Sequence, residues 1–150
     1  MAATRTATVT WSGTLADGEG TVSAGSSGVF ADLPLSWGSR TEAHDGRTSP
    51  EELLAAAHSS CFAMALSGAL GRAGTPPDHV HVSATVTFDK VGDAWTVTRS
   101  ELDVVGTVPG ITSAEFDAVA EQVKDNCPIS RALAGNVELT VSATLEEEHD

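Results

Sequence analysis

The N-terminal part of the chain alternates between apolar and polar residues over short stretches. Residues 4–12 (TRTATVTWS) follow the two-residue period of a strand, and the turn residues LADGEG at 15–20 predict a hairpin into a second strand. Residues 25–46 are rich in Gly and Ser but also hold Phe30 and Trp37. We therefore expect short strands or an ordered loop there, and not a flexible linker.

Strand patterns return in the second half of the chain. Residues 80–88 and 95–106 are both strand-like, and the turn at 90–94 that joins them predicts a second hairpin. Residues 137–145 (VELTVSATL) alternate again, which predicts a closing strand. The acidic residues 146–150 that follow predict a solvated tail.

The longest predicted helix begins with three start signals. Ser49 suits the N-cap, Pro50 the first helical position, and Glu52 lies three residues after the cap, as in a capping box. The following run, LLAAAHSSCFAMALSGAL, is apolar or small on nearly every face. It predicts a buried central helix that ends at Gly71 or Gly74.

Two shorter helices are predicted before the closing strand. Thr112 and Glu115 repeat the capping-box spacing at the start of a helix that reaches about Lys124. Pro128 opens a second helix that ends at Gly135.

The order of these elements predicts the fold class. Hairpins surround helices without a repeated strand–helix–strand order, which is typical of the α+β class. A chain of 150 residues with 41% hydrophobic residues suits one domain with a substantial core. We therefore expect a single domain over residues 1–150.

Acidic residues dominate the charge. The net charge is −13, and residues 76–150 carry 14 acidic against 4 basic residues, so this half would repel a nucleic-acid backbone. No stretch approaches the roughly 20 apolar residues that span a bilayer. The N-terminus also lacks the apolar segment of a secretory signal. We expect a cytoplasmic protein with no nucleic-acid or membrane partner.

Two cysteines are the clearest sign of chemistry, since a pair in a reducing compartment more often indicates redox or metal chemistry than a structural disulfide. Cys61 lies in the middle of the long helix, where it is either a small core residue or a nucleophile that needs a cation from elsewhere. His58, one turn earlier, is either its partner or a buried histidine with satisfied ring nitrogens. Cys127 precedes Pro128 at the start of a short helix, and the helix dipole alone favours it as the activated thiol.

Other interpretations of these residues stay open. Glu51 either complements the helix dipole or holds an arginine that points an N–H at a thiolate. A zinc site built from His58, Cys61 and Cys127 would need a fourth ligand and has no paired C-x-x-C spacing, which disfavours it. Residues 18–28 lack the phosphate-loop and dinucleotide fingerprints, so a nucleotide cofactor is not expected.

Two segments, SPEELLAAAHSSCFAMALS at 49–67 and NCPISRAL at 126–133, resemble the OsmC/Ohr family of bacterial thiol peroxidases, and the likeness covers nearly the whole chain. It implies an OsmC-like fold with antiparallel sheets wrapped around the buried helix. It also implies an interlocked homodimer with two active sites near the interface. Arg40, in the segment 39–42 (SRTE), matches the OsmC branch. The Ohr branch carries its arginine in the first hairpin, where this chain has none.

The resemblance also implies a role for each site residue. Cys61 would attack an organic hydroperoxide and become a sulfenic acid, and Cys127 would resolve it as an intramolecular disulfide. Arg40 would be the thiolate partner, oriented by Glu51. Lipoylated proteins or other small dithiols would be the reductant, and no metal or haem cofactor is needed because sulfur carries both electrons.

Two other functions compete with this interpretation. The cysteine pair could sense oxidation in a redox sensor or binding dimer without turnover, or both cysteines could be inert core residues of a structural dimer. Turnover with a dithiol reductant separates an enzyme from the first alternative. Loss of free thiol with peroxide separates it from the second.

Overall fold

A computed structural model describes residues 1–147, so part of the predicted acidic tail, residues 148–150, lies outside the described residues. The chain forms two compact units, and the boundary between them falls between Leu53 and Leu54. Helix α2 (Pro50–Arg72) contributes its first turn to unit 1 and the remainder to unit 2.

Unit 1 is built on the predicted N-terminal hairpin, which is confirmed. Strands β1 (Thr8–Ser12), β2 (Glu19–Ser23) and β3 (Leu33–Leu35) form one antiparallel sheet in that order, and a single turn of helix, α1 (Gly38–Thr41), follows. Trp11 faces Gly20 across the hairpin. A Cβ atom on Gly20 would lie 2.7 Å from the Trp11 ring, so this position accepts only glycine without a shift.

Helix α2 begins at the predicted Pro50, with Ser49 as its cap. The Ser49 hydroxyl accepts a hydrogen bond from the backbone N–H of Glu52 at 3.1 Å. The predicted capping box is only half formed, because the Glu52 carboxylate accepts from the Thr48 hydroxyl at 2.7 Å and not from the Ser49 backbone. The helix ends at Arg72, between the two glycines proposed as its end.

The burial of α2 differs from the prediction. Within the single chain one stripe is fully buried, with residues four apart: His58, Phe62, Leu66 and Leu70. Met64, on another face, is 74% exposed. The helix is also long and apolar enough to cross a membrane by length and composition, contrary to our expectation, although core helices pass the same test. Helix α2 therefore carries more apolar side chains than the single chain buries.

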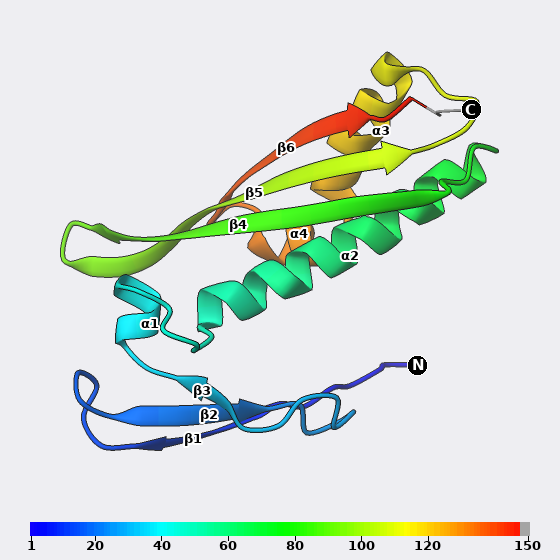
Figure 1. The fold of residues 1–150 in the computed structure, drawn as a ribbon. Coiled ribbons are helices and arrows are strands. Elements are labelled where there is room, and N and C mark those ends of the chain that lie inside the picture. The colour runs from blue at the N-terminus through cyan, green and yellow to red at the C-terminus, as the bar shows by residue number, and fades with distance from the viewer. Residues whose placement is uncertain (148–150) are drawn as a thin grey trace. The chain divides into compact units, whose positions relative to one another are not determined.

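Unit 2 contains the second sheet, with strand order β4 (His79–Val91), β5 (Ala94–Thr107) and β6 (Glu138–Leu145) (Figure 1). The β4–β5 hairpin is antiparallel, as predicted. Strand β6 instead pairs with β5 in parallel, so the expectation of purely antiparallel sheets was wrong. Two helices separate these strands along the chain, and such a crossover returns the second strand in the same direction as the first.

The crossover consists of α3 (Ser113–Asn126) and α4 (Pro128–Leu133). The predicted capping box at the start of α3 is confirmed in both directions. The Thr112 hydroxyl accepts from the Glu115 backbone N–H at 3.2 Å, and the Glu115 carboxylate accepts from the Thr112 backbone N–H at 2.9 Å.

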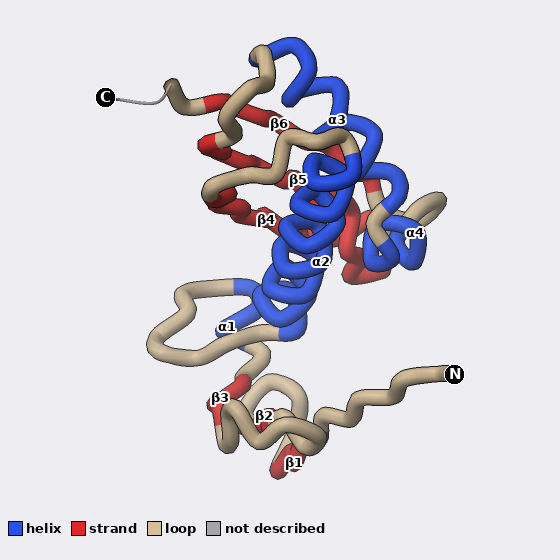
Figure 2. Tube along the Cα trace, turned by 90° about the vertical axis from the view of Figure 1, so that its right-hand side faces the viewer, coloured by secondary structure: helices blue, strands red, loops and turns tan. Residues whose placement is uncertain are grey.

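The core of unit 2 lies between its sheet and the helices α2 and α3, which cover one face of the sheet (Figure 2). Each of these elements contributes large side chains with almost no exposed surface. The fully or nearly fully buried members are Phe62, Leu66 and Leu70 from α2, Leu102 and Val104 from β5, and Phe116, Ala120 and Val123 from α3. This packing holds the middle of α2 against the sheet and so positions the residues around Cys61.

Gly106→Ala should lower the free energy of unfolding by about 1–3 kcal/mol, because the added Cβ would lie 2.7 Å from the buried Phe116 ring. Gly71→Ala is the matched control. An added Cβ there meets nothing within 4 Å, so the change should raise helix stability by about 0.5–1 kcal/mol. Urea unfolding of both variants measures the difference, and equal midpoints would contradict the packing described here.

Candidate active site

Arg40 and Glu51 form a closely bonded ion pair in unit 1. Arg40 lies in the single turn of α1, and Glu51 lies in the first turn of α2. The Nε atom of Arg40 donates to both carboxylate oxygens of Glu51, at 3.1 and 3.2 Å, and Nη2 donates to Oε1 at 2.6 Å. The Glu51 side chain is 9% exposed and the Arg40 side chain 28%. The carboxylate therefore fixes one edge of the guanidinium plane.

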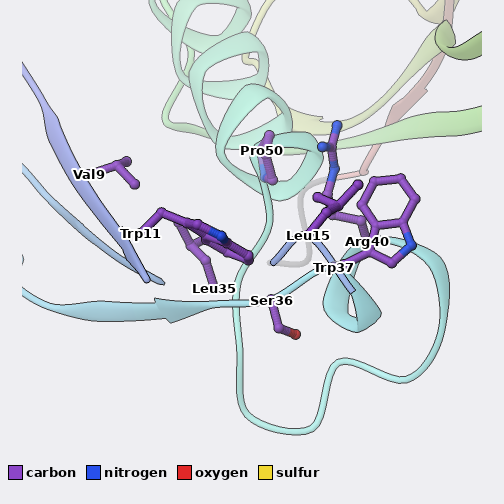
Figure 3. A pocket seen from close by; sticks show the side chains of 8 residues that line it. All are labelled: Val9, Trp11, Leu15, Leu35, Ser36, Trp37, Arg40 and Pro50. Carbon is purple, nitrogen blue, oxygen red and sulfur yellow. The ribbon is translucent and has the colours of Figure 1, made fainter. Parts of the chain in front are cut away.

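An apolar pocket of about 360 Å³ lies beside Arg40 in unit 1 (Figure 3). Its walls come from the N-terminal hairpin, the β3–α1 segment and the start of α2. The lining residues are Val9, Trp11, Leu15, Leu35, Ser36, Trp37, Arg40 and Pro50. The guanidinium carbon of Arg40 lies 5.5 Å from the centre of the Trp37 ring, a cation–π distance. The pocket thus combines apolar walls with one cation.

Cys61 and Cys127 meet in unit 2, and both are free thiols. Cys61 is partly buried on α2 and packs against the core cluster that contains Cys127. Burial raises the pKa of the Cys61 thiol above its ordinary value. A hydrogen bond from the Ile129 backbone opposes this rise, whereas the hydrogen bond and charge of Cys127 add to it. Unit 2 by itself therefore favours the thiol form of Cys61 over the thiolate.

Cys127 is held at the junction of two helices. It follows the last residue of α3 and caps the start of α4, and only 1% of it is exposed. Its sulfur accepts a hydrogen bond from the Ser130 backbone N–H at 3.4 Å and lies 3.1 Å from the Ser130 hydroxyl. The predicted position of Cys127 at the start of a short helix is confirmed.

His58 is fully buried, and both of its ring nitrogens have partners. Nδ1 lies 2.7 Å from the Ser100 hydroxyl, and Nε2 lies 2.8 Å from the Ser130 hydroxyl. Burial lowers the pKa of His58, which favours the neutral ring. Of the two interpretations left open, a histidine with satisfied ring nitrogens agrees with these contacts. The connection to Cys127 through Ser130 is an additional finding.

Sequence reasoning did not single out Ser100 or Ser130. A signal existed for Ser130, because a serine three residues after an N-cap cysteine returns to it within one helical turn. Ser100 carries no local signal, since only the packing of β5 against α2 brings it to His58. Within residues 1–147 no group of three or more His, Cys, Asp or Glu side chains is arranged to hold a metal ion.

The four predicted site residues thus form two pairs. Arg40 and Glu51 are joined in unit 1, and Cys61 and Cys127 lie together in unit 2. The first pair joins residues 11 positions apart, and the second joins residues 66 positions apart.

The OsmC-like protein family model matches residues 43–142, and this segment contains Glu51 and both cysteines. Peroxiredoxin OsmC of Escherichia coli is 40% identical over 129 residues, which cover 86% of this chain and 89% of that protein. The chain belongs to the OsmC-like family. The organic hydroperoxide resistance protein-like 2 of Staphylococcus saprophyticus is a more distant relative, 32% identical over 65% of this chain and 68% of its own length.

Solved structures agree with this membership in the OsmC-like family. An organic hydroperoxide resistance protein from Elizabethkingia anophelis superposes with a TM-score of 0.70 at 26% identity, covering 99% of this chain and 100% of that one. An OsmC-like protein from Mycoplasma pneumoniae reaches a TM-score of 0.73 at 15% identity over 98% of this chain and 100% of that one. The second likeness shows the fold alone.

In this member of the OsmC-like family, Cys127→Ala should lower the pKa of the Cys61 thiol, because it removes a hydrogen bond and a charge that both raise it. The pH dependence of Cys61 alkylation by iodoacetamide, followed by mass spectrometry, measures this pKa in each protein. Cys61→Ala is the control that shows which signal belongs to Cys61. An unchanged or higher pKa in Cys127→Ala would contradict the arrangement of the two thiols.

Proposed function

We propose that this protein is a thiol peroxidase that reduces organic hydroperoxides, and hydrogen peroxide less efficiently, to alcohols or water. The observation that carries the proposal is the placement of two free thiols, Cys61 and Cys127, beside the same core of unit 2 in a chain of the OsmC-like family. Relatives named peroxiredoxin OsmC and organic hydroperoxide resistance protein support the same chemistry. Proximity of the thiols matters because a disulfide can then form with little movement of the backbone.

The proposed reaction begins at Cys61, the more exposed of the two thiols. Its thiolate attacks the terminal oxygen of the hydroperoxide, so that an S–O bond forms and the O–O bond breaks. The alkoxide takes a proton and leaves as the alcohol, while Cys61 becomes a sulfenic acid. The Cys127 sulfur then attacks Cys61, a disulfide forms, and the sulfenic oxygen leaves as water.

A thiolate at Cys61 requires a cation, since burial raises the pKa of this thiol. We assign this role to Arg40. Its guanidinium is bound along one edge by Glu51, which fixes its orientation, and a guanidinium held in this way can also donate to sulfur and peroxide. The same guanidinium would stabilise the charge that develops as the O–O bond breaks.

A homodimer is part of this proposal. Exposed apolar side chains support a second copy, since Val9, Leu15 and Met64 are each more than half exposed in the single chain.

The substrate class follows from the pocket beside Arg40. Its walls are mainly apolar, and its volume of about 360 Å³ suits an alkyl chain or an aromatic ring. Each CH₂ group buried there contributes about 0.8 kcal/mol to binding. Larger organic hydroperoxides should therefore bind better than hydrogen peroxide.

A dithiol completes the proposed cycle in the cytoplasm. One dithiol sulfur attacks the protein disulfide, the second closes a disulfide within the reductant, and both protein thiols are regenerated. Lipoyl groups or other small dithiols have the chemistry for this step. Sulfur carries both electrons throughout, so the proposal names no metal or haem.

Cys61→Ser should abolish turnover of cumene hydroperoxide with dihydrolipoamide, because a serine hydroxyl with no strong base beside it cannot replace a thiolate. Cys127→Ser should react once and then persist as the Cys61 sulfenic acid or become overoxidised. A dimedone probe with mass spectrometry detects that sulfenic acid. Retained turnover in Cys61→Ser would overturn the assignment. A wild-type protein that is oxidised once but not recycled would favour a sensor.

Arg40→Ala should raise the pKa of the Cys61 thiol and slow its oxidation, because it removes the cation that favours the thiolate. Each unit by which the pKa rises disfavours the thiolate by about 1.4 kcal/mol. Arg47→Ala is the matched control, because Arg47 pairs with the exposed Asp45 at 3.5 Å. Arg40→Lys should also be impaired, because an ammonium keeps the charge but cannot present a planar fork. Stopped-flow oxidation across pH measures all three, and equal loss in both alanine variants would remove Arg40 from the site.

A further inference from the structure

A buried chain of polar side chains leads away from Cys127, and the proposed reaction has not yet used it. The Cys127 sulfur lies 3.1 Å from the Ser130 hydroxyl, which lies 2.8 Å from Nε2 of His58. Nδ1 of His58 lies 2.7 Å from the Ser100 hydroxyl. His58, Ser100 and Ser130 have no exposed surface, and Cys127 is 1% exposed.

The hydrogen bonds of this row of buried side chains can all run in one direction. If the Cys127 thiol donates to the Ser130 oxygen, then the Ser130 hydroxyl can donate to Nε2 of His58. Nδ1 of a neutral His58 carries the remaining proton and donates to the Ser100 oxygen. The donors of Cys127, Ser130 and His58 then each have an acceptor, as polar groups in a core require. A small shift of each proton toward His58 would leave a thiolate at Cys127.

We propose that Ser130 and His58 form a proton path that takes the thiol proton of Cys127 when this sulfur forms the disulfide, and returns a proton to it when the disulfide is reduced. The proposal rests on the proposed function for the origin of the sulfenic acid. The path itself rests on the four buried groups and their three contacts. Ser130 touches the reacting sulfur, whereas His58 acts through Ser130 and is a positioning residue.

In the disulfide-forming step, the S–H proton of Cys127 passes to the Ser130 oxygen as the Ser130 proton passes to Nε2 of His58. The freed electron pair of Cys127 forms the bond to the Cys61 sulfur, and the S–O bond of the sulfenic acid breaks. The leaving hydroxide takes a proton from solvent to become water. His58 then returns its proton to solvent, and the net product is one disulfide and one water.

The surroundings of His58 suit an acceptor that is neutral at neutral pH. Two thiols lie close to it along the chain or through Ser130: Cys61 is three residues later on α2, and Cys127 is linked to it by the Ser130 hydroxyl. Charged residues flank its serine partners, but Arg99 and Glu101 beside Ser100, and Arg131 beside Ser130, are exposed to solvent. Burial is the cause of the lowered pKa of His58. The ring can therefore take a proton at neutral pH without first having to lose one.

A test without peroxide separates this proposal from the proposed function. The Cys61–Cys127 disulfide is formed in the full-length protein with diamide, and its reduction by dithiothreitol is followed by quenched alkylation and mass spectrometry. Dithiothreitol attacks the more exposed Cys61, and Cys127 is the leaving thiolate. Ser130→Ala removes the group that protonates this leaving sulfur, so reduction should slow by about tenfold or more.

The pH profile distinguishes a proton path from a structural role. We correct each rate for the dithiothreitol thiolate fraction. In the wild type the corrected rate should fall as the pH rises through and above neutral, because burial lowers the pKa of His58 and only the protonated ring can return a proton through Ser130. In Ser130→Ala this pH dependence should be lost, because Cys127 then leaves as a thiolate without that proton. Ser100→Ala is the matched control. It removes a buried hydroxyl from the other ring nitrogen of His58, and its effect on the rate should be much smaller.

Ser130→Thr and Ser130→Val form a second pair, because both add the same branch and only threonine keeps the hydroxyl. Threonine should retain most of the rate and valine should not. Wild-type rates and profiles in Ser130→Ala would overturn the proton path, as would equal slowing in Ser100→Ala or in the threonine and valine variants. A wild-type protein that cycles with diamide and dithiothreitol but ignores cumene hydroperoxide would overturn the proposed function alone.

Discussion

Burial of one stripe of α2 is the constraint on which unit 2 depends. Phe62, Leu66 and Leu70 repeat every four residues and are fully enclosed by the sheet and α3. This repeat fixes the rotation of the helix about its own axis, because turning it would expose these side chains to water. Cys61 precedes Phe62, so the same rotation directs it toward the start of α4, where Cys127 lies. Packing of apolar residues thus determines which thiols can meet.

His58 extends this stripe by one more turn and places a polar ring where an apolar residue would ordinarily lie. A core accepts such a ring only if its nitrogens are hydrogen-bonded, and Ser100 and Ser130 provide both bonds. One serine comes from the sheet and the other from α4. The ring therefore ties three elements together, and it leaves Cys127 connected to a group that can exchange protons.

Unit 1 holds a cation beside apolar side chains. Arg40 lies beside an apolar pocket, where a loosely held guanidinium would turn toward water. The hydrogen bonds to Glu51, a nearly buried carboxylate at the positive end of α2, hold it in place instead. The Arg40 cation therefore keeps a fixed orientation beside the pocket.

The sequence by itself determined the features that depend on near neighbours. The caps at Ser49 and Thr112, both hairpins and the two cysteine motifs depend on short spacings, and the structure agrees with them. Only the tertiary structure decided the parallel pairing of β6, the single buried stripe of α2 and the contacts of His58 with Ser100 and Ser130. Those features join residues 39 to 72 positions apart, or depend on which face of an all-apolar helix meets the sheet. Local patterns carry no information on such choices, because every face of α2 looks equally suited to burial until the other elements pack against one of them.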